Sequence, residues 1–360
     1  MKADKEIVLW DKNSPCYINQ SAFGLLICIV QCAWLQRHNE GLIKPPNHQP
    51  LVIGNPSDTI NTADGVVTLY IPEFSRPTGK YINKLLLRIL NRFVRSGSIA
   101  IAGNPCTPGL GLMDELTKNG ATDMLKKSPQ RTIVVNCKKH AEDLDAVVFK
   151  AEPFMRLMVR EEWSSLSDCI AAMHSKYRVR AKKALTESGV LQSNIYRGLE
   201  IPASMFGQMA ELLSQTLAKK TIALPSDLNR LLRSFANQFG NQFEVQVYEF
   251  ENRTVGFLSR IYLPSGVYRM HIGYSSIHAK QWHIYQRMML DLMDAGITSG
   301  AKSINLGRTA TEIKSTLGAE PQENYFVLLS RNRFIRAAAR TYKNLFFKPA
   351  DYIIRHPFKG

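Results

Sequence analysis

The sequence predicts an α/β protein of the α+β kind, with two domains that each hold a mixed, mostly antiparallel sheet flanked by helices. The length of 360 residues exceeds the usual size of one core and favours two domains. In the second half, short runs of β-branched and aromatic residues lie between turn residues, which is typical of an antiparallel meander. Between residues 243 and 302 the apolar period changes once, from that of a strand to that of a helix. Strands, a helix and further strands in this order indicate a mixed sheet.

Turn residues divide the second half into its elements. Glu251-Asn252-Arg253 and Pro264-Ser265-Gly266 supply the two turns of the meander, and Gly300 stands where the helix has to end. The predicted elements are strands 243–250, 254–263 and 267–275, helix 281–297, strand 303–307 running parallel to strand 267–275, and a closing antiparallel strand at 324–330.

The first half has no visible residue-by-residue repeat of the second; its likeness to the second half is inferred from the order of elements together with the family resemblance given below. The predicted elements there are helix 21–35, strands 49–53 and 66–71, helix 81–94, strand 98–102, a loop at 103–111 and a helix that begins at Met113. We expect a degenerate N-terminal domain over 1–160, a linking helix within 161–190, a C-terminal domain over 191–330 and a basic amphipathic helical tail over 331–360.

The chain is basic, and its charge is uneven. The net charge is +16; residues 1–165 carry 20 basic and 16 acidic side chains, whereas residues 166–360 carry 26 and 14. A basic field attracts polyanionic partners, among which coenzyme A, acyl-carrier protein, transfer RNA and anionic lipid all qualify. The charge favours the second half as the part that meets the anion, but it does not choose among them.

Several protein classes are disfavoured. The best candidate for a membrane span, residues 22–35, is short of the roughly 20 apolar residues required. The first six residues mix charges of both signs, unlike a secretory signal. The six cysteines form no Cys-x-x-Cys pair, which fits reduced thiols, and the eight histidines show no metal-ligand spacing. We therefore expect a cytoplasmic protein with no metal.

Two motifs point to a family. Residues 307–319 read Gly-Arg-Thr-Ala-x-Glu-x-Lys-x-x-Leu-Gly-Ala, and residues 175–184 read Ser-Lys-Tyr-Arg-x-Arg-x-Lys-Lys-Ala. Together with the element order, they resemble GNAT-superfamily N-acyltransferases of the Fem-like acetyltransferase type, which are related to the Fem peptidoglycan-bridge aminoacyltransferases. The resemblance is clear over about residues 150–330.

The resemblance implies tandem, degenerate GNAT-like domains and a defined reaction. An acyl or aminoacyl group moves from acyl-CoA, acyl-carrier protein or aminoacyl-tRNA to an amine of a small-molecule or lipid-linked acceptor. No cofactor is bound tightly, because the thioester is a co-substrate. In this fold strands 267–275 and 303–307 splay apart, and an exposed backbone N–H polarises the thioester carbonyl.

Four side chains are candidates for proton transfer. Alternation places His271 on the wetter face of its strand with Arg269 and Gly273, and places Tyr268, Met270, Ile272 and Tyr274 on the opposite face. The catalytic candidates are Glu312 as base, His271, Tyr274 and Tyr285. Each has a structural alternative: His271 as a buried histidine, the tyrosines as core aromatics, and Glu312 as part of a capping box that Thr309 begins.

Binding candidates are mostly cationic. Arg308 suits an acidic donor or a substrate carboxylate, and Lys314 can pair with either. The donor- or substrate-binding set is Arg308, Lys314, Gly307, Asn305, Lys280, Lys176 and Arg178. Residues 274–283 lack the glycine loop by which ordinary GNAT members hold pyrophosphate, which leaves carrier protein, charged tRNA or a differently held acyl-CoA open. Lys280 and His278 can still meet phosphate.

A second function class remains open. A non-catalytic basic adaptor could use the same cleft, or the basic tail, to bind RNA or an anionic membrane. The interleaved cations and apolar residues after Ser330 fit a helix that lies on a membrane surface, peripheral to its inner face. They equally fit a helix that packs on its own protein.

Overall fold

The computed structural model describes residues 56–63, 65–70, 99–102, 113–129, 131–218, 228–277, 279, 281–308, 310–346 and 352–359. The predicted helices 21–35 and 81–94, strand 49–53 and loop 103–111 lie outside these residues. Strand 66–71 is found as β2 (Gly65–Tyr70) and strand 98–102 as β3 (Ile99–Ala102).

The chain forms two compact units, each made of segments that are distant in sequence. Unit 1 comprises Met1–Glu152, Lys220–Ser226 and Glu323–Asp351, and unit 2 comprises Pro153–Lys219, Asp227–Gln322 and Tyr352–Gly360. In the described part of the chain, each unit holds a seven-stranded mixed sheet with helices packed on it. The predicted fold class is therefore confirmed.

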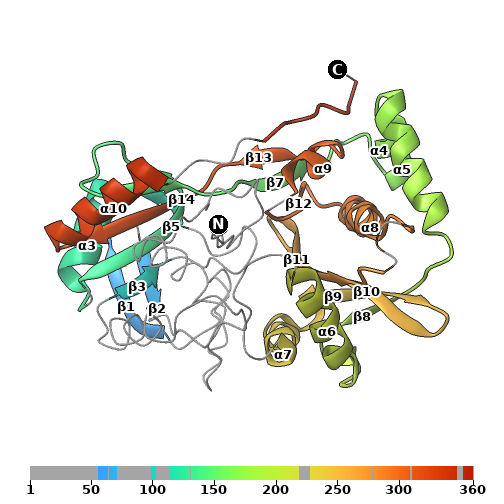
Figure 1. The fold of residues 1–360 in the computed structure, drawn as a ribbon, viewed down its shortest axis with the longest axis horizontal. Coiled ribbons are helices and arrows are strands. Elements are labelled where there is room, and N and C mark those ends of the chain that lie inside the picture. The colour runs from blue at the N-terminus through green and yellow to red at the C-terminus, as the bar shows by residue number, and fades with distance from the viewer. Residues whose placement is uncertain are drawn as a thin grey trace, which may run out of the picture. The chain divides into compact units, whose positions relative to one another are not determined.

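The sheet of unit 2 follows the predicted element order closely. Its strands run β13-β7-β12-β11-β10-β9-β8 (Figure 1). The meander is β9 (Phe243–Phe250), β10 (Arg253–Leu263) and β11 (Gly266–Tyr274); α8 (Ile284–Thr298) then leads to β12 (Ser303–Asn305), which is parallel to β11. The other strands are β7 (Phe154–Met158), β8 (Gln192–Arg197) and β13 (Glu320–Gln322). Glu251 and Asn252 adopt φ of 49° and 60°, as a tight hairpin requires, and Gly300 ends α8 with φ 69°.

Helices cover both faces of this sheet. One face carries α8 together with α4 (Leu166–Ala171) and α5 (Ser175–Glu187), and α9 (Thr311–Ser315) follows β12. The other face carries α6 (Met205–Ala218) and α7 (Leu228–Phe239), which pack on β11 and β9. Short 3₁₀ helices at Gly198–Glu200 and Gly240–Gln242 join these elements.

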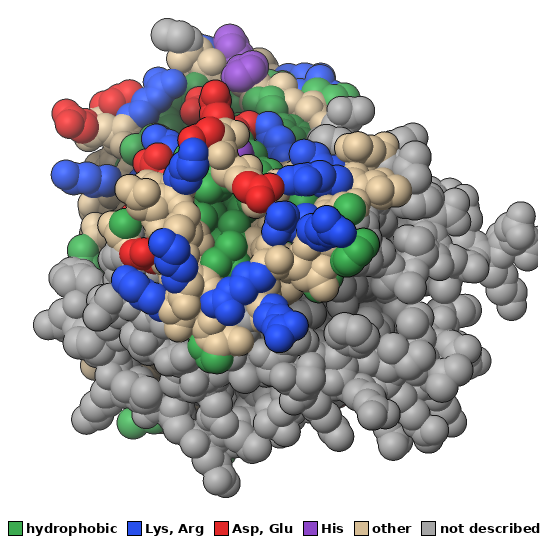
Figure 2. All heavy atoms as spheres, turned by 90° about the vertical axis from the view of Figure 1, so that its left-hand side faces the viewer, with side chains coloured by type: hydrophobic (Ala, Val, Ile, Leu, Met, Phe, Trp, Pro, Cys, Tyr) green, Lys and Arg blue, Asp and Glu red, His purple; other side chains and the backbone are tan. Residues whose placement is uncertain are grey.

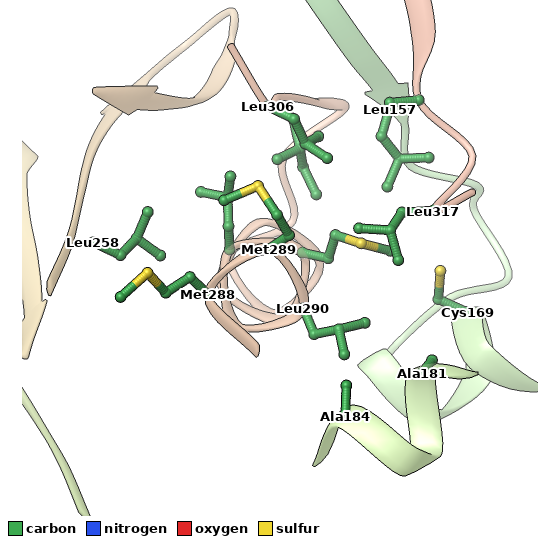
Figure 3. Close-up of a cluster of buried hydrophobic side chains, with 14 of the residues drawn as sticks. Leu157, Cys169, Ala181, Ala184, Leu258, Met288, Met289, Leu290, Leu306 and Leu317 are labelled. Carbon is green, nitrogen blue, oxygen red and sulfur yellow. The ribbon is translucent and has the colours of Figure 1, made fainter. Parts of the chain in front are cut away.

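The main core of unit 2 surrounds α8. Figure 3 shows this helix end-on, with Met288 turned toward Leu258 of β10 and Leu290 turned toward Ala184 of α5. Ala184 is fully buried, and its small side chain lets α5 approach α8 closely. A helix buried on most of its surface holds the ends of β11 and β12 in fixed positions.

One element predicted in the first half differs in the structure of unit 1. Its strands run β1-β2-β3-β5-β14-β6, with β4 on β5; beyond β2 and β3 these are β1 (Pro56–Thr62), β4 (Met113–Leu116), β5 (Thr132–His140), β6 (Val147–Lys150) and β14 (Tyr325–Ser330). The helix predicted to begin at Met113 was wrong, because residues 113–116 pair with β5 as a strand. The helix, α3 (Lys118–Lys127), begins after Thr117, whose Oγ1 accepts a hydrogen bond from the Gly120 N–H.

The last strand lies in a different sheet from the one predicted. Residues 324–330 were expected to close the C-terminal sheet, but β14 pairs with β5 and β6 in unit 1. Its residues after Tyr325 are buried, as expected of a central strand with neighbours on both sides. Conversely, β7, which was expected in the first domain, pairs with β12 and β13 in unit 2. Boundaries near 160 and 330 therefore do not describe the two units, because each sheet takes a strand from across the expected border.

The segment 331–360 is not one tail. Helix α10 (Arg333–Phe346) belongs to unit 1, where Arg336 and Arg340 both pair with Asp145. Residues 352–360 belong to unit 2, where Phe358 packs on Trp163. In Figure 2, Lys and Arg side chains, with several Asp and Glu among them, border a strip of hydrophobic side chains on the part of this face that is drawn in colour.

Candidate active site

The sheet of unit 2 forks where pairing between β11 and β12 stops. The paired residues are Val267 with Ile304 and Tyr268 with Asn305, and no others. From Arg269 to Gly273, within the residues that the structure describes, the β11 edge that faces β12 has no strand partner. The splaying predicted between these strands is therefore present.

The chain after β12 turns toward β7 instead of β11. The Leu306 N–H donates to the Met155 carbonyl at 2.8 Å, and the Met155 N–H donates to the Gly307 carbonyl at 3.1 Å. Strand β11 meanwhile continues along β10 as far as Tyr274. Each arm of the fork is thus hydrogen-bonded to its outer neighbour.

A β-bulge in β11 coincides with the fork. Pairing with β10 shifts between Leu258–Ile272 and Arg260–Arg269, so that Met270 and His271 oppose the single residue Ser259. The Ser259 hydroxyl accepts from the His271 N–H at 2.9 Å and donates to the His271 carbonyl at 3.1 Å. Bulges bend a strand and end regular pairing, which is what happens here.

The bulge also overturns the predicted alternation of β11. Ile272 and Tyr274 pack in the cluster around α8 with Val267, an odd-numbered residue that strict alternation would place on the other face. One extra residue shifts the register of every later side chain. Met270 therefore does not share a face with Ile272, contrary to the sequence-based expectation.

The bend after β12 is shaped by two predicted residues. The Gly307 N–H donates to Asn305 Oδ1 at 2.7 Å, and Gly307 has φ 77°, a conformation that favours glycine. Lys314, which is fully buried, donates from Nζ to the Gly307 carbonyl at 2.8 Å and to the Arg308 carbonyl at 2.5 Å. Lys314 thus braces the bend, rather than reaching out to a donor as predicted.

Arg308 lies at the outer side of this bend. Its guanidinium carbon stands 5.4 Å from the ring centroid of Phe154 on β7, a cation–π distance. The side chain is only partly buried. Its planar, charged guanidinium thus lies at the bend beside the fork.

The structure brings Tyr274 and Tyr285 together. Their rings are 6.3 Å apart between centroids and meet edge-on, with Tyr274 at the end of β11 and Tyr285 in the first turn of α8. Burial raises the pKa of Tyr274, so its hydroxyl stays protonated at neutral pH. The Tyr274 N–H is held by Thr216 Oγ1 of α6 at 2.9 Å.

His271 is not on a wet face. Its ring is tilted by 52° against that of Phe235 on α7, with the centroids 5.2 Å apart, and its buried Nδ1 has no hydrogen-bond partner among the described residues. Burial, aided by the charge of Arg269, lowers the pKa of His271 to about 4. The predicted wetter face is wrong because α6 and α7 cover it.

Glu312 is engaged elsewhere. Its Oε1 accepts from Arg355 at 2.7 Å, and both side chains are about half exposed. Helix α9 begins after Ala310, which has φ 50° and makes no side-chain cap; Thr309, from which the capping box was predicted, lies outside the described residues. Glu312 therefore ties the C-terminal segment to α9.

The predicted basic residues divide into three cases. Lys176 is exposed on α5, whereas Arg178 donates from Nη1 to the Met173 carbonyl at 3.1 Å near the start of that helix. Lys280 and His278 lie outside the described residues. Lys176 is thus exposed, whereas Arg178 is half-buried and hydrogen-bonded to the backbone before its helix.

Sequence analysis missed the buried charges on β9, β10 and β11. Arg260 and Glu244 are 2% and 1% exposed and form an ion pair, and Arg269 is 9% exposed. The sequence offered one signal of such a buried charge: Arg269 lies within a predicted strand, among apolar residues. It was treated as part of a wetter face instead.

Comparison with known proteins adds the following. No known protein family and no curated protein matches the sequence. Among solved structures, one similar to this chain is the C-terminal domain of a protein described as a lysylphosphatidylglycerol synthetase, from Agrobacterium fabrum (10% identity, 94% of this chain, 95% of that chain, TM-score 0.47). Another is FemX, with 9% identity over 78% of this chain and 86% of that chain and a TM-score of 0.45. A third is a tandem GNAT protein from the clavulanic acid biosynthesis pathway, with 10% identity over 74% of this chain and 79% of that chain and a TM-score of 0.39. Likeness at this level says nothing about the reaction, so the argument rests on the fork itself.

Proposed function

We propose that unit 2 transfers an acyl or aminoacyl group from an activated carrier to an amine, at the fork between β11 and β12. The observation that carries this proposal is the unpaired edge of β11 beside the bulge. An extended, amide-containing carrier arm can add to such an edge as an extra strand. A free backbone N–H there can polarise the carbonyl that the amine attacks.

The reaction needs few special groups. The amine nitrogen forms a bond to the carbonyl carbon, the bond from that carbon to the carrier's sulfur or oxygen breaks, and the amine loses one proton. The leaving thiolate or alkoxide takes up one proton. We assign that donation to Tyr274, whose pKa is raised by burial and which is therefore protonated at neutral pH, together with Tyr285, whose ring it contacts.

Cations beside the fork are assigned to the carrier. Arg308 supplies the charge nearest the bend, and exposed Lys176 on α5 adds to the field that attracts an anionic carrier. Acyl-CoA, acyl-carrier protein and aminoacyl-tRNA remain the candidate donors. Glu312, predicted as the base, is held by Arg355, and we propose an anchoring role for it.

The test is a direct transfer assay. Purified protein is incubated with each labelled donor class and a mixture of amines, and acid-stable labelled product is measured. We expect one donor class to be consumed, and the Tyr274→Phe/Tyr285→Phe double variant to lose activity at least about 100-fold, the lower end of the usual range for a proton donor. Product mass spectrometry in cells that express wild type or Arg308→Ala identifies the acceptor. The proposal is refuted if no donor is consumed faster than in the absence of protein.

One observation favours a second candidate function. On α10 of unit 1 the exposed Phe334 lies under the guanidinium of Arg333, whose carbon is 5.1 Å from the ring centroid. Cations around exposed aromatic side chains suit an anionic membrane surface. No helix in the described ranges is long and apolar enough to cross a bilayer. Flotation with anionic vesicles should be weakened by Arg333→Gln/Phe334→Ser; equal flotation of this variant and wild type would exclude the contact.

A further inference from the structure

Four charged residues form a row across the sheet of unit 2. Cross-strand pairing sets Arg197 opposite Glu244, Glu244 opposite Arg260, and Arg260 opposite Arg269. Residues that are directly opposite on neighbouring strands share a face, and this row lies on the face that α8 covers. The row holds three arginines and one carboxylate.

The single carboxylate is fully used by two of the arginines. Glu244 forms ion pairs with buried Arg260 and with exposed Arg197, and the Tyr262 hydroxyl donates to it at 3.1 Å. Arg260 also donates to Gln246 at 3.0 Å. Arg260 is therefore a neutralised buried arginine.

Arg269, in contrast to Arg260, has no carboxylate partner among the described residues. Its Nε donates to the Leu306 carbonyl at 2.6 Å, and in the described part of the chain no carboxylate lies within 4.0 Å of its guanidinium. It stands directly opposite another arginine, an unfavourable arrangement for like charges. A guanidinium stays protonated in proteins, so it cannot escape burial by losing its charge. A buried cation without a counter-charge is costly, which indicates that an anion belongs there.

The position of Arg269 is the vertex of the fork. It is the first residue of β11 beyond the last pair with β12, and it bonds the first residue after β12. Its guanidinium lies against Gly307, where an added Cβ would come within 1.9 Å of Nη2. Only glycine leaves room there, so the bend is fitted to the guanidinium.

We propose that Arg269 binds a carboxylate of a co-substrate in the fork, an inference that rests on the proposed transferase function. A carboxylate is planar, carries one negative charge and accepts two parallel hydrogen bonds from a guanidinium. It matches one unpaired arginine in charge and shape. The carboxylate belongs either to the acceptor amine or to the acyl group of the donor.

Arg260 provides a matched control, because it is the same residue type on the same face of the next strand but has its carboxylate. Arg269→Met should leave the melting temperature of the protein equal to or above that of wild type, since it removes an uncompensated charge. Arg260→Met should lower it by roughly 10 °C, because it leaves Glu244 buried with only its exposed partner. Equal losses in the two variants would overturn the proposal, since Arg269 would then be structural.

Ligand probes test binding directly. Glycine and acetate should raise the melting temperature of wild type with increasing concentration, but not that of Arg269→Met, and glycinamide should have no effect on either. Inorganic phosphate acting in place of the carboxylates, or carboxylates acting alike on both proteins, would refute the assignment.

Turnover identifies the source of the carboxylate. If it is on the acceptor, Arg269→Met should raise KM for an amino acid at least tenfold and leave KM for its amide unchanged. If the carboxylate is on the donor, Arg269→Met should raise KM for succinyl-CoA at least tenfold and leave KM for butyryl-CoA unchanged. Unchanged KM in all four cases defeats this inference while the transferase function stands. Absence of all transfer in wild type defeats the transferase function, and the melting comparison still reports on Arg269.

Discussion

Replacing Ser259 with alanine should disturb the bulge that opens the fork. Ser259 is fully buried and makes two hydrogen bonds, both to the backbone of His271. Alanine would remove both bonds and leave an N–H and a carbonyl without their partner. With about 1–2 kcal/mol for each lost bond and unsatisfied group, we expect a loss of about 2–4 kcal/mol in the free energy of unfolding. Turnover should fall at least about tenfold, because a shift of about 1 Å in a reacting group can cost 100-fold.

Urea unfolding and initial rates of transfer would measure the two effects. Ser188→Ala is the matched control, because Ser188 is also fully buried in unit 2 and donates to the Ala184 carbonyl at 2.7 Å, at the end of α5. Its Oγ also accepts from Arg287 Nη1 of α8 at 3.2 Å, so Ser188→Ala should likewise cost about 2–4 kcal/mol, but it should leave turnover unchanged. Wild-type turnover in Ser259→Ala, despite the expected loss of stability, would refute the link between bulge and fork.

Three further predictions concern the neighbouring residues. Lys314→Met removes two hydrogen bonds but also removes the cost of burying an ammonium group, so it should change the free energy of unfolding by no more than about 1 kcal/mol. It should lower turnover, because the bend loses its brace. Strong destabilisation in urea would contradict this. Glu312→Gln and Arg355→Gln should behave alike in turnover and stability if Glu312 is an anchor, whereas inactivity of the Glu312 variant alone would make it the base. Burial lowers the pKa of His271 from 6.5 to about 4, so the unfolded chain binds a proton before the folded chain does as the pH falls. The free energy of unfolding should therefore be highest above pH 6.5 and should fall by about 2 kcal/mol by pH 5. Urea unfolding of His271→Leu should not show this loss, and an equal loss in both proteins would contradict the assignment.

Local sequence patterns predicted most of the strands and the main helix of unit 2. The strand 243–250 was predicted with the bounds that β9 has, since its eight residues are rich in β-branched and aromatic side chains between clear turn residues. Gly300 and the turn at Glu251-Asn252 were identified because positive φ has a recognisable residue preference. The strand pair that forms the fork followed from the crossover order β11, α8, β12.

Features that depend on distant residues were missed. The bulge in β11 is fixed by Ser259 on another strand, and no pattern within 267–275 marks it. The transfer of β14 to unit 1 depends on a gap between β5 and β6, which lies almost two hundred residues earlier in the sequence. Likewise, Glu312 was read as a base because nothing nearby predicted its partner Arg355.

Hydrogen exchange of the β11 backbone tests the central claim most directly. The amides of residues 269–273 should exchange slowly when the donor that supports turnover is bound, and faster without it, while those of β9 stay unchanged. Protection confined to this arm of the fork is the predicted result. Unchanged exchange at residues 269–273 under saturating donor would contradict the account, because the donor would then bind elsewhere.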